Sequence, residues 1–502
     1  MFDTCAAIRR LRGGVGLRQN NKTEVQMSNA ALKVASEQSR IDQVFDRQRR
    51  ASREKPYPSY QERIDALNKI DKILMENMDA ICAAVNADFG NRCPQETKLL
   101  DISQLTSAVA YHKKQLKKWM KPEKRHVGLN FFGAKNRVIP QPKGVVGVVS
   151  PWNYPLALAV GPSITALAAG NRVMVKMAAN SQNLCRLMDK LVSAEFSDEQ
   201  FAVIPGVSAG AFTDRPWDHL VFTGSPATGK VVMETASKYL TPVTLELGGK
   251  SPTIVAPDYN LRTAAERVLW GKCINGGQTC TAPDYLFLPR AKLDEFVQHA
   301  KDVVSARYAS ADSSDFTSLI DDKAFARISQ TLEDATQKGA RAVRLVPKGE
   351  PNAKDRKYPP TVVLDVKEDM LIMRDEIFGP LLPIKLYDSI DEVIQYINAG
   401  ERPLGLYLFS NDKRLQEKVI YNTLSGGVSL NDTVLQAAQH DMPFGGVGNS
   451  GMGHYHGKEG FLEFSKLRPV FQQARQSGIL MLAPPYGPRY EKLMKLVFKF
   501  RL

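Results

Sequence analysis

The segment Asn275–Cys280, Asn-Gly-Gly-Gln-Thr-Cys, places a thiol shortly after two adjacent glycines. Glycine lets the backbone turn sharply, so a ligand can approach the sulfur and the neighbouring amide N–H closely. A covalent nucleophile with an oxyanion site needs such an arrangement, which makes Cys280 the candidate nucleophile. Taken alone, a cysteine is more often a small buried apolar residue. That interpretation is kept for the cysteines without such a setting: Cys5, Cys82, Cys93, Cys185 and Cys273.

A single carboxylate, Glu246, lies between Leu245 and Leu247 just before Gly248 and Gly249. Apolar neighbours are expected to remove water from the carboxylate and so to raise its pKa toward the working pH. A carboxylate of that kind can accept a proton from water, so Glu246 is a candidate general base. The alternative is an exposed strand residue.

An asparagine between two prolines follows an apolar run in the segment Ser150–Pro155, Ser-Pro-Trp-Asn-Tyr-Pro. The side-chain N–H of Asn153 could donate to a developing oxyanion. A turn or helix-capping asparagine is an equally good interpretation of the segment alone.

The segment Phe222–Lys230, Phe-Thr-Gly-Ser-Pro-Ala-Thr-Gly-Lys, joins an expected strand to a helix that starts near Pro226. A helix N-terminus of this kind can receive phosphate oxygens, although a Gly-Ser turn is a weak signal by itself. The segment lacks the GxGxxG dinucleotide fingerprint, and the chain has no P-loop, HExxH or GxSxG motif. His454 and His456 have no third ligand nearby, so we predict no metal site.

The elements that must position these groups follow from hydrophobic periodicity. Apolar residues at three- and four-residue spacing predict helices from Ser39 to Lys118, and Leu261–Gly271 also suits a helix. Short β-branched or apolar runs predict strands at Val145–Val149, Arg172–Lys176, His219–Thr223, Pro252–Val255 and Tyr285–Leu288. The alternation of helices and strands predicts an α/β fold with parallel sheets covered on both faces.

Composition narrows the class of protein. The 502 residues are 43% hydrophobic and 24% charged, which is ordinary for a globular protein. No apolar run is long enough to span a membrane. The net charge of +14 is concentrated in residues 1–60, 113–125 and 485–502, and no nucleic-acid-binding module accompanies it, so we predict no nucleic-acid partner. Six scattered cysteines predict a reducing compartment, and we expect a cytoplasmic protein.

The first residues are basic, with Arg9, Arg10, Arg12 and Arg18, but lack the apolar core of a secretory signal. We predict a mobile N-terminal extension over residues 1–38. Within it, residues 1–26 would be an extended start before Met27, with a transit segment as the alternative.

Together the motifs resemble the NAD(P)-dependent aldehyde dehydrogenase superfamily, in the same order from about residue 55 to residue 475. The matching motifs are SPWNYP (150–155), AAGN (168–171), FTGS (222–225), LELGGK (245–250), GGQTC (276–280), EIFGP (376–380) and PFGGVGNSG (443–451). PFGGVGNSGMG and the tail from Pro485 to Tyr490 resemble the class 3-like branch. Bacterial coniferyl-aldehyde dehydrogenases are the members most similar in sequence to the segments GNRVMVK and LTPVTLELGGKSP.

The resemblance implies a Rossmann-type cofactor domain, an α/β catalytic domain and a small β oligomerisation extension. Residues 39–124 and 146–246 would form the cofactor domain, and 247–432 the catalytic domain. Residues 125–145 and 433–475 would form bridging segments, and 476–502 a basic tail. It further implies a homodimer. The basic tail helix at Tyr490–Leu502 could at most associate weakly with a surface, and a tail docked across a dimer partner is an equally good interpretation.

The resemblance also assigns roles to individual residues. Cys280 becomes the nucleophile, Glu246 the general base and Asn153 the oxyanion donor beside the Cys280 N–H. The residues that would hold NAD or NADP are Lys176 at the adenosine ribose, Gly224 and Ser225 at the pyrophosphate, Glu376 at the nicotinamide-side ribose, and Phe378, Gly229 and Trp152. Tyr154 and Phe444 would line the aldehyde tunnel.

One departure bears on the cofactor. The family usually follows its lysine with Pro-Ser-Glu, whereas this chain continues from Lys176 with Met177, Ala178 and Ala179. The missing carboxylate would otherwise accept from the ribose hydroxyls and repel a 2′-phosphate, so we expect NADP to be tolerated better than usual.

The resulting hypothesis is the oxidation of an aldehyde to its acid through a Cys280 thiohemiacetal and thioester. Coniferaldehyde-like aromatic aldehydes are the leading substrate class. Medium- or long-chain aliphatic aldehydes are the near alternative. A thioester hydrolase built on Cys280 would need a histidine partner, and the nearest in sequence, His299, lies in no motif. A purely structural or binding protein would have no reason to combine Cys280, Glu246 and Asn153.

Overall fold

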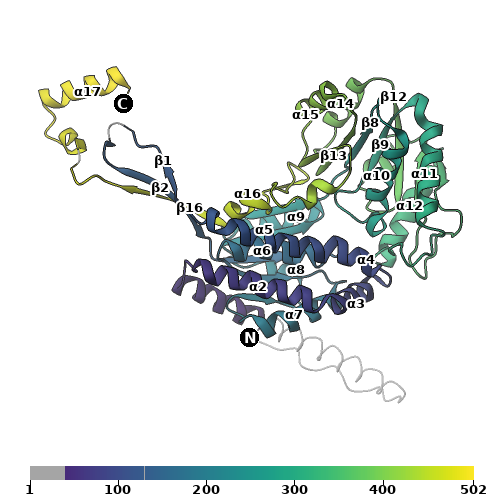
Figure 1. The fold of residues 1–502 in the computed structure, drawn as a ribbon, viewed down its shortest axis with the longest axis horizontal. Helices are drawn as coiled ribbons and strands as arrows, with labels where there is room; N and C mark the ends of the chain where they lie inside the picture. The colour runs from purple at the N-terminus through teal and green to yellow at the C-terminus, as the bar shows by residue number, and fades with distance from the viewer. Residues whose placement is uncertain (1–39, 129–130, 477, 502) are drawn as a thin grey trace, which may run out of the picture.

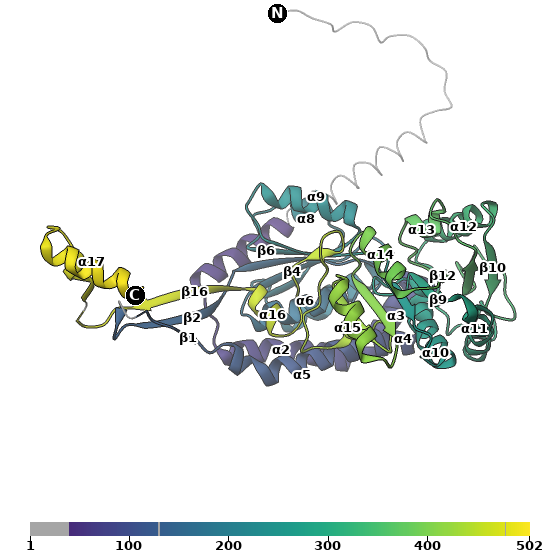
Figure 2. The same cartoon turned by 90° about the horizontal axis from the view of Figure 1, so that it is seen from above.

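Three sheets organise residues 40–128, 131–476 and 478–501, the part of the chain that the computed structural model describes (Figure 1). A six-stranded sheet and a seven-stranded sheet form the body of the molecule, and a three-stranded sheet projects from it (Figure 2). The expected N-terminal extension, residues 1–38, and Cys5 lie outside the described residues.

The six-stranded sheet is parallel apart from one short edge strand. Its strands, in spatial order, are β15 (Gly451–Met452), β7 (Val243–Leu247), β6 (His219–Gly224), β3 (Val145–Val149), β4 (Arg172–Lys176) and β5 (Phe201–Val203). Along the chain, β4 and β5 are added on one side of β3, and then β6 and β7 are added on the other side. This reversal of strand order leaves a crevice at the carboxyl ends of the strands, where α/β proteins bind ligands.

Helices cover both faces of this sheet because successive side chains of a strand point to opposite sides. Val146 and Val148 pack in one core, under α2 (Tyr60–Glu76), α3 (Met78–Phe89), α5 (Ser103–Trp119), α6 (Ala157–Ala168) and α7 (Gln182–Glu195). Val145 and Val149 face the other core, which is covered by residues 40–54, α8 (Ala209–Thr213) and α9 (Pro226–Ser237).

The seven-stranded sheet is also parallel except at one edge. Its spatial order is β10 (Arg341–Arg344), β11 (Thr361–Leu364), β12 (Leu381–Tyr387), β9 (Tyr285–Pro289), β8 (Pro252–Val255), β13 (Gly405–Phe409) and β14 (Gly427–Leu430). One face packs against α10 (Leu261–Cys273) and α11 (Leu293–Arg307). The other packs against α12 (Asp322–Gln337), α13 (Leu371–Arg374), α14 (Ile390–Ala399) and α15 (Lys413–Asn422).

Short elements connect these layers. They are α4 (Pro94–Thr97), the π-helical turn η1 (Lys98–Ile102), η3 (Ile274–Gly277), η4 (Arg290–Lys292), η5 (Leu435–Ala438) and α16 (Gly457–Glu463).

The projecting sheet is antiparallel and consists of β1 (Glu123–Arg125), β2 (Lys135–Pro142) and β16 (Ser465–Gln472). Beyond it lie η6 (Gly478–Leu482) and α17 (Pro488–Phe500), which Figures 1 and 2 show far from the body. No residue of α17 is buried.

The α/β class with parallel sheets is confirmed, as are the strands expected from the apolar runs and the helices expected between Ser39 and Lys118. The division into domains stays a prediction. Within residues 433–475, β15 joins the six-stranded sheet and β16 the projecting sheet. Among the described residues, no helix has both the length and the apolar character needed to cross a bilayer.

Candidate active site

The loop that carries Cys280 has a left-handed backbone at three consecutive positions. The φ angles of Asn275, Gly276 and Gly277 are 52°, 62° and 77°. A Cβ atom at Gly277 would lie 2.3 Å from the carbonyl oxygen of Gly379, so no other residue fits there. The expected glycine turn before the thiol therefore exists, and it is packed against a second loop.

Buried polar side chains hold this turn in place. The Gln278 amide donates to the carbonyls of Asn275 at 2.9 Å and Ser318 at 3.1 Å, and it accepts from the Ile320 N–H at 2.9 Å. The Glu96 carboxylate accepts from the Asn275 N–H at 3.1 Å. Besides the bond within the turn, these bonds tie it to two other segments, residues 318–320 and Glu96, so the position of the thiol is over-determined.

Among the described free cysteines, Cys280 is the one that is partly exposed, while Cys82, Cys93, Cys185 and Cys273 are buried. Its surroundings raise the pKa of the thiol to about 12, chiefly through burial and then through the carboxylates of Glu376 and Glu246. The backbone N–H groups of Cys280 and Thr281 oppose that rise by donating to the sulfur. The same donors can stabilise negative charge at this point.

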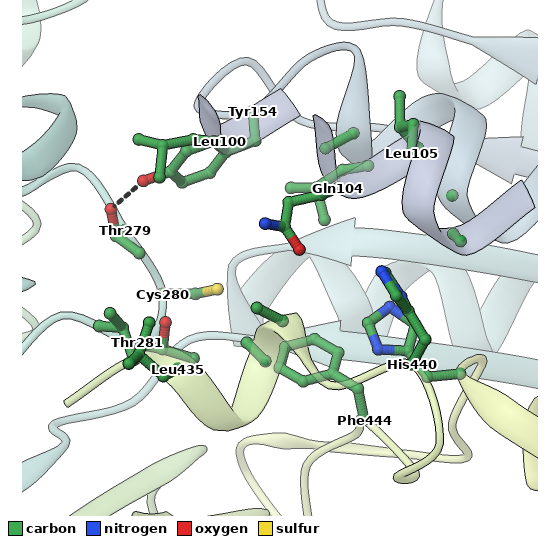
Figure 3. A pocket seen from close by; sticks show the side chains of 18 of the residues that line it. Leu100, Gln104, Leu105, Tyr154, Thr279, Cys280, Thr281, Leu435, His440 and Phe444 are labelled. Atoms are coloured by element: carbon green, nitrogen blue, oxygen red, sulfur yellow. Dashed lines mark hydrogen bonds between the residues drawn. The ribbon is translucent and has the colours of Figure 1, made fainter. Parts of the chain in front are cut away.

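A cavity of about 260 Å³ opens beside the Cys280 sulfur (Figure 3). Its wall combines leucines from α5 and η1, aromatic rings and three histidines. Residues that line it include Leu100, Gln104, Leu105, His112, Tyr154, Trp270, Leu435, His440, Phe444, Tyr455 and His456. A concave, mainly apolar space with a few polar groups is the usual form of a small-molecule site.

Both residues expected along the substrate tunnel lie on this wall. The Tyr154 hydroxyl shares a 2.6 Å hydrogen bond with Thr279 Oγ1, next to Cys280 (Figure 3). The Phe444 ring stacks on the His456 ring with centroids 5.3 Å apart. Their contact with an aldehyde stays a prediction.

Asn153 is buried beside the thiol loop, with 3% of its surface exposed. Its Nδ2 donates to the Gln278 carbonyl at 3.2 Å, and its own carbonyl accepts from Asn275 Nδ2 at 2.9 Å. The structure therefore brings Asn153 and the Cys280 loop together. The Asn153 amide must share or exchange its present bond to act on an oxyanion.

Glu246 lies on β7, between Thr223 of β6 and Gly451 of β15. Its carboxylate is buried, and neither oxygen has a hydrogen-bond partner among the described residues. Burial raises its pKa well above the ordinary value, and its charge in turn raises the pKa of Cys280. A buried carboxylate without a partner is costly, which favours a functional role for it.

A buried ion pair lies behind the Asn153 loop. Arg92 and Asp101 meet at 2.9 Å, and both side chains are fully buried. The second oxygen of Asp101 accepts from the Ala157 N–H at the start of α6 at 2.9 Å, and Arg92 also donates to the Asn153 carbonyl at 3.4 Å. The pair thus joins the segment between α3 and α4, together with η1, to the loop after β3.

The residues expected at a dinucleotide lie along the crevice of the six-stranded sheet. Lys176 ends β4, and its side chain is buried without a hydrogen bond or ion pair to a described residue, which lowers its pKa. Ser225 caps α9 by accepting from the Thr228 N–H at 3.3 Å. A Cβ at Gly229 would lie 2.7 Å from Leu247, so this glycine lets α9 approach the sheet closely.

The loop Glu376–Pro380 lies across from that crevice. The N–H of Gly249 donates to the Glu376 carboxylate, whose pKa rises to about 8, chiefly through burial. Phe378 has a φ of 47° and packs edge-on against Trp152, with ring centroids 5.4 Å apart. An uncommitted lysine, a capped helix N-terminus next to Gly224 and a carboxylate suit the ribose and phosphate groups of NAD or NADP.

Several residues of the site carried no local signal in the sequence. Arg92, Asp101 and Glu96 precede the motifs by tens to nearly two hundred residues. Lys250 ends the LELGGK motif, residues 245–250. Only the structure shows that it holds the Glu376 loop, by donating to the carbonyls of Ile372 and Asp375.

Two comparisons identify relatives by sequence. The model of the aldehyde dehydrogenase family matches residues 22–470. A Pseudomonas aeruginosa protein named "Probable coniferyl aldehyde dehydrogenase" is 45% identical over 463 residues, which cover 92% of this chain and 96% of the relative.

Solved structures agree with this similarity. "Substrate bound state of Staphylococcus Aureus AldH" superimposes with a TM-score of 0.85 at 33% identity, covering 91% of this chain and 99% of that one. A Mycobacterium tuberculosis aldehyde dehydrogenase complexed with NAD+ has a TM-score of 0.76 at 27% identity, covering 86% and 89%.

The buried pair behind the site gives a prediction about stability. Arg92→Met leaves Asp101 buried without a compensating charge, so we expect the free energy of unfolding to fall by about 3 to 5 kcal/mol. Chemical unfolding followed by tryptophan fluorescence measures the change. The control is Arg290→Met, which breaks a 3.1 Å pair with Asp388 whose side chains are 62% and 68% exposed. That change should be about 1 kcal/mol or less. Equal losses in the two variants would contradict the assignment.

Proposed function

Because this chain belongs to the aldehyde dehydrogenase family, we propose that it oxidises coniferaldehyde-like aromatic aldehydes to their acids through Cys280. It is an NAD(P)-dependent aldehyde dehydrogenase. The observation that carries the proposal is the partly exposed Cys280 thiol at a cavity with aromatic walls, next to a buried carboxylate without a partner. The name of the Pseudomonas aeruginosa relative supports the substrate class.

The first step forms a bond between the Cys280 sulfur and the aldehyde carbon. The carbonyl π electrons move to oxygen, and the thiol proton passes to a base or to water. The backbone N–H groups at Cys280 and the Asn153 amide then donate to the oxyanion. Each such donor contributes about 3 to 4 kcal/mol to transition-state stabilisation in related chemistry. A tetrahedral, oxyanionic carbon is the species from which hydride can leave.

A bound nicotinamide would supply the hydride acceptor, which is redox chemistry that the protein itself cannot supply. Lys176 and Ser225 would hold the adenosine ribose and the pyrophosphate, and Glu376 the nicotinamide-side ribose. Phe378 and Trp152, which pack edge-on against each other, would lie beside the bound nicotinamide.

The second half of the reaction hydrolyses the Cys280 thioester. Glu246 takes a proton from water, the water oxygen attacks the acyl carbon, and the carbon–sulfur bond breaks to release the acid. A raised pKa suits Glu246 because a base is most effective when its pKa is near the working pH. Sulfur suits position 280 because it attacks well and also leaves well.

We also propose a cytoplasmic homodimer. Support comes from the free cysteines among the described residues, which suit a reducing compartment. The projecting sheet and α17 expose large apolar side chains, including Phe471, Leu496 and Phe498. Exposed apolar groups of this kind suit a contact with a second copy.

The nucleophile can be tested directly. We expect Cys280→Ala to abolish aldehyde-dependent reduction of NAD or NADP, because no carbon–sulfur bond can form. Cofactor binding, measured by fluorescence titration, should stay nearly unchanged. The matched control is Cys273→Ala, a buried cysteine on α10 that should retain oxidation. Residual oxidation by Cys280→Ala would refute the mechanism.

The general base predicts a pH dependence. Because burial raises the pKa of Glu246, the carboxylate is protonated below that pKa and its base form grows as pH rises. We therefore expect kcat to fall at low pH, by up to about tenfold per pH unit below the pKa.

Glu246→Gln should lower steady-state kcat by about 10² to 10⁴ while keeping a first-turnover burst of cofactor reduction. Stopped-flow absorbance separates the two phases. A variant that loses the burst and the steady state in equal measure would assign Glu246 to an earlier step.

The departure at Ala179 predicts the cofactor preference. Ala179 is exposed, and no carboxylate stands at this position to repel a 2′-phosphate. We expect kcat/KM for NADP within about tenfold of that for NAD, and Ala179→Glu should lower the NADP value by about another tenfold. Ala179→Gln is the uncharged control. A strong preference of the unaltered enzyme for NAD would reject this prediction.

A further inference from the structure

Three histidines lie on the wall of the cavity beside Cys280, and one of them is fully engaged by the protein. His112 Nδ1 donates to the Ala108 carbonyl at 2.8 Å, and its Nε2 meets Thr165 Oγ1 at 3.1 Å. Both ring nitrogens therefore have partners. His112 serves the packing of α5 against α6.

The other two rings leave hydrogen-bonding capacity unused. His440 makes no hydrogen bond to a described residue, and the buried Nδ1 of His456 has no partner among them. Burial lowers the pKa of both rings, that of His456 to about 3. Each ring is thus neutral near pH 7 and offers one N–H donor and one acceptor nitrogen.

Aromatic contacts hold these two rings as one wall. The His440 and His456 centroids are 6.2 Å apart, His440 stacks on Tyr111, and His456 stacks on Phe444. The Tyr111 hydroxyl donates to the Asp441 carboxylate, which fixes the chain next to His440. The wall is therefore built from packed rings.

The wall faces the reacting sulfur across the cavity. Figure 3 shows Cys280 and His440 on opposite sides of the space, with the Gln104 amide directed into it from α5. Gln104 also makes no side-chain hydrogen bond within the described residues. An aldehyde held at Cys280 would thus point its far end toward polar groups without partners, through a mainly apolar space.

We infer that His440 and His456, with Gln104, form a subsite that hydrogen-bonds the phenolic hydroxyl and adjacent ether oxygen of a hydroxylated aromatic aldehyde. A phenol O–H suits an imidazole acceptor, and the ring oxygens suit imidazole or amide N–H donors. An alkyl chain would instead exclude water from the imidazole and amide groups without forming hydrogen bonds to them, which would weaken binding. This inference rests on the proposed function and identifies what selects its substrates.

The experiment compares three aldehydes with the same propenal end. Coniferaldehyde carries the hydroxyl and the methoxy group, 3,4-dimethoxycinnamaldehyde lacks the O–H donor, and cinnamaldehyde lacks both substituents. The readout is the ratio of kcat/KM for coniferaldehyde to kcat/KM for cinnamaldehyde. The unaltered enzyme should prefer coniferaldehyde by at least about tenfold, with the dimethoxy compound between the two.

His440→Phe keeps a ring on Tyr111 but removes both nitrogens, and His456→Phe does the same beside Phe444. We expect each variant to lower the preference ratio by about three- to tenfold. A role in packing alone would lower kcat/KM for both aldehydes by the same factor and leave the ratio unchanged, which would overturn the inference.

The matched control is His454→Gln, in the same loop as His456 but not on the cavity wall. It should leave the ratio unchanged. Thermal unfolding reports whether a variant has failed to fold. If His440→Phe does not fold, His440→Asn is the smaller substitution, and its amide should keep part of the preference ratio.

The two proposals fail in different ways. If Cys280-dependent oxidation proceeds on hexanal or decanal but on none of the three aromatic aldehydes, the proposed substrate class is wrong. If all three aromatic aldehydes are oxidised at equal kcat/KM, the substrate class stands and the histidine subsite is wrong.

Discussion

The left-handed turn at Asn275–Gly277 is the constraint on which the site depends. Three consecutive positive φ angles bring the chain against the Gly379 carbonyl. The chain then continues through Thr279 to Cys280, whose sulfur faces the cavity. Such a backbone is unfavourable in isolation and persists only where its surroundings over-determine it. The side-chain hydrogen bonds of Gln278 and Glu96 supply that restraint. Because the turn is rigid, oxyanion donors and substrate wall can be arranged around a fixed sulfur.

Burial serves both stability and chemistry here, and the two are in conflict at Glu246. The sheet that forms the core around β7 also removes water from the carboxylate, and nothing among the described residues replaces that water. An isolated buried carboxylate lowers stability because its charged form has lost its hydration. The same loss of hydration raises its pKa. The proposed role of Glu246 as a general base relies on the same shift, because a carboxylate with a raised pKa is a stronger proton acceptor. Arg92 and Asp101 show the other solution, in which two buried charges neutralise each other.

What could be predicted from the sequence was local. Strands such as β3 and β4, the glycine turn before Cys280 and the helix start at Pro226 follow from residues adjacent in the chain. Long-range contacts could not be inferred, because no periodicity links Glu96 to Asn275 or Arg356 to Phe89. The roles of His440 and His456 could not be inferred either: the sequence shows His454 and His456 two residues apart in a glycine-rich stretch, and only the fold places His456 with the distant His440 on one cavity wall. The resemblance to a family supplied roles for single residues, not the packing that makes those roles possible.

The loop from Phe444 to Gly457 connects the cavity wall to Glu246, the proposed general base. Gly451 pairs with Glu246 across β15 and β7, and a Cβ at Gly451 would lie 2.0 Å from the Leu245 carbonyl, so the loop packs directly against β7. The Tyr455 N–H donates to the Phe444 carbonyl at 3.3 Å, which ties the cavity wall to the same loop. A change that shifts this loop must therefore move the aldehyde wall and the carboxylate together. Under the proposed mechanism, altering this wall for a different aldehyde would therefore also disturb the carboxylate that is proposed to act in deacylation.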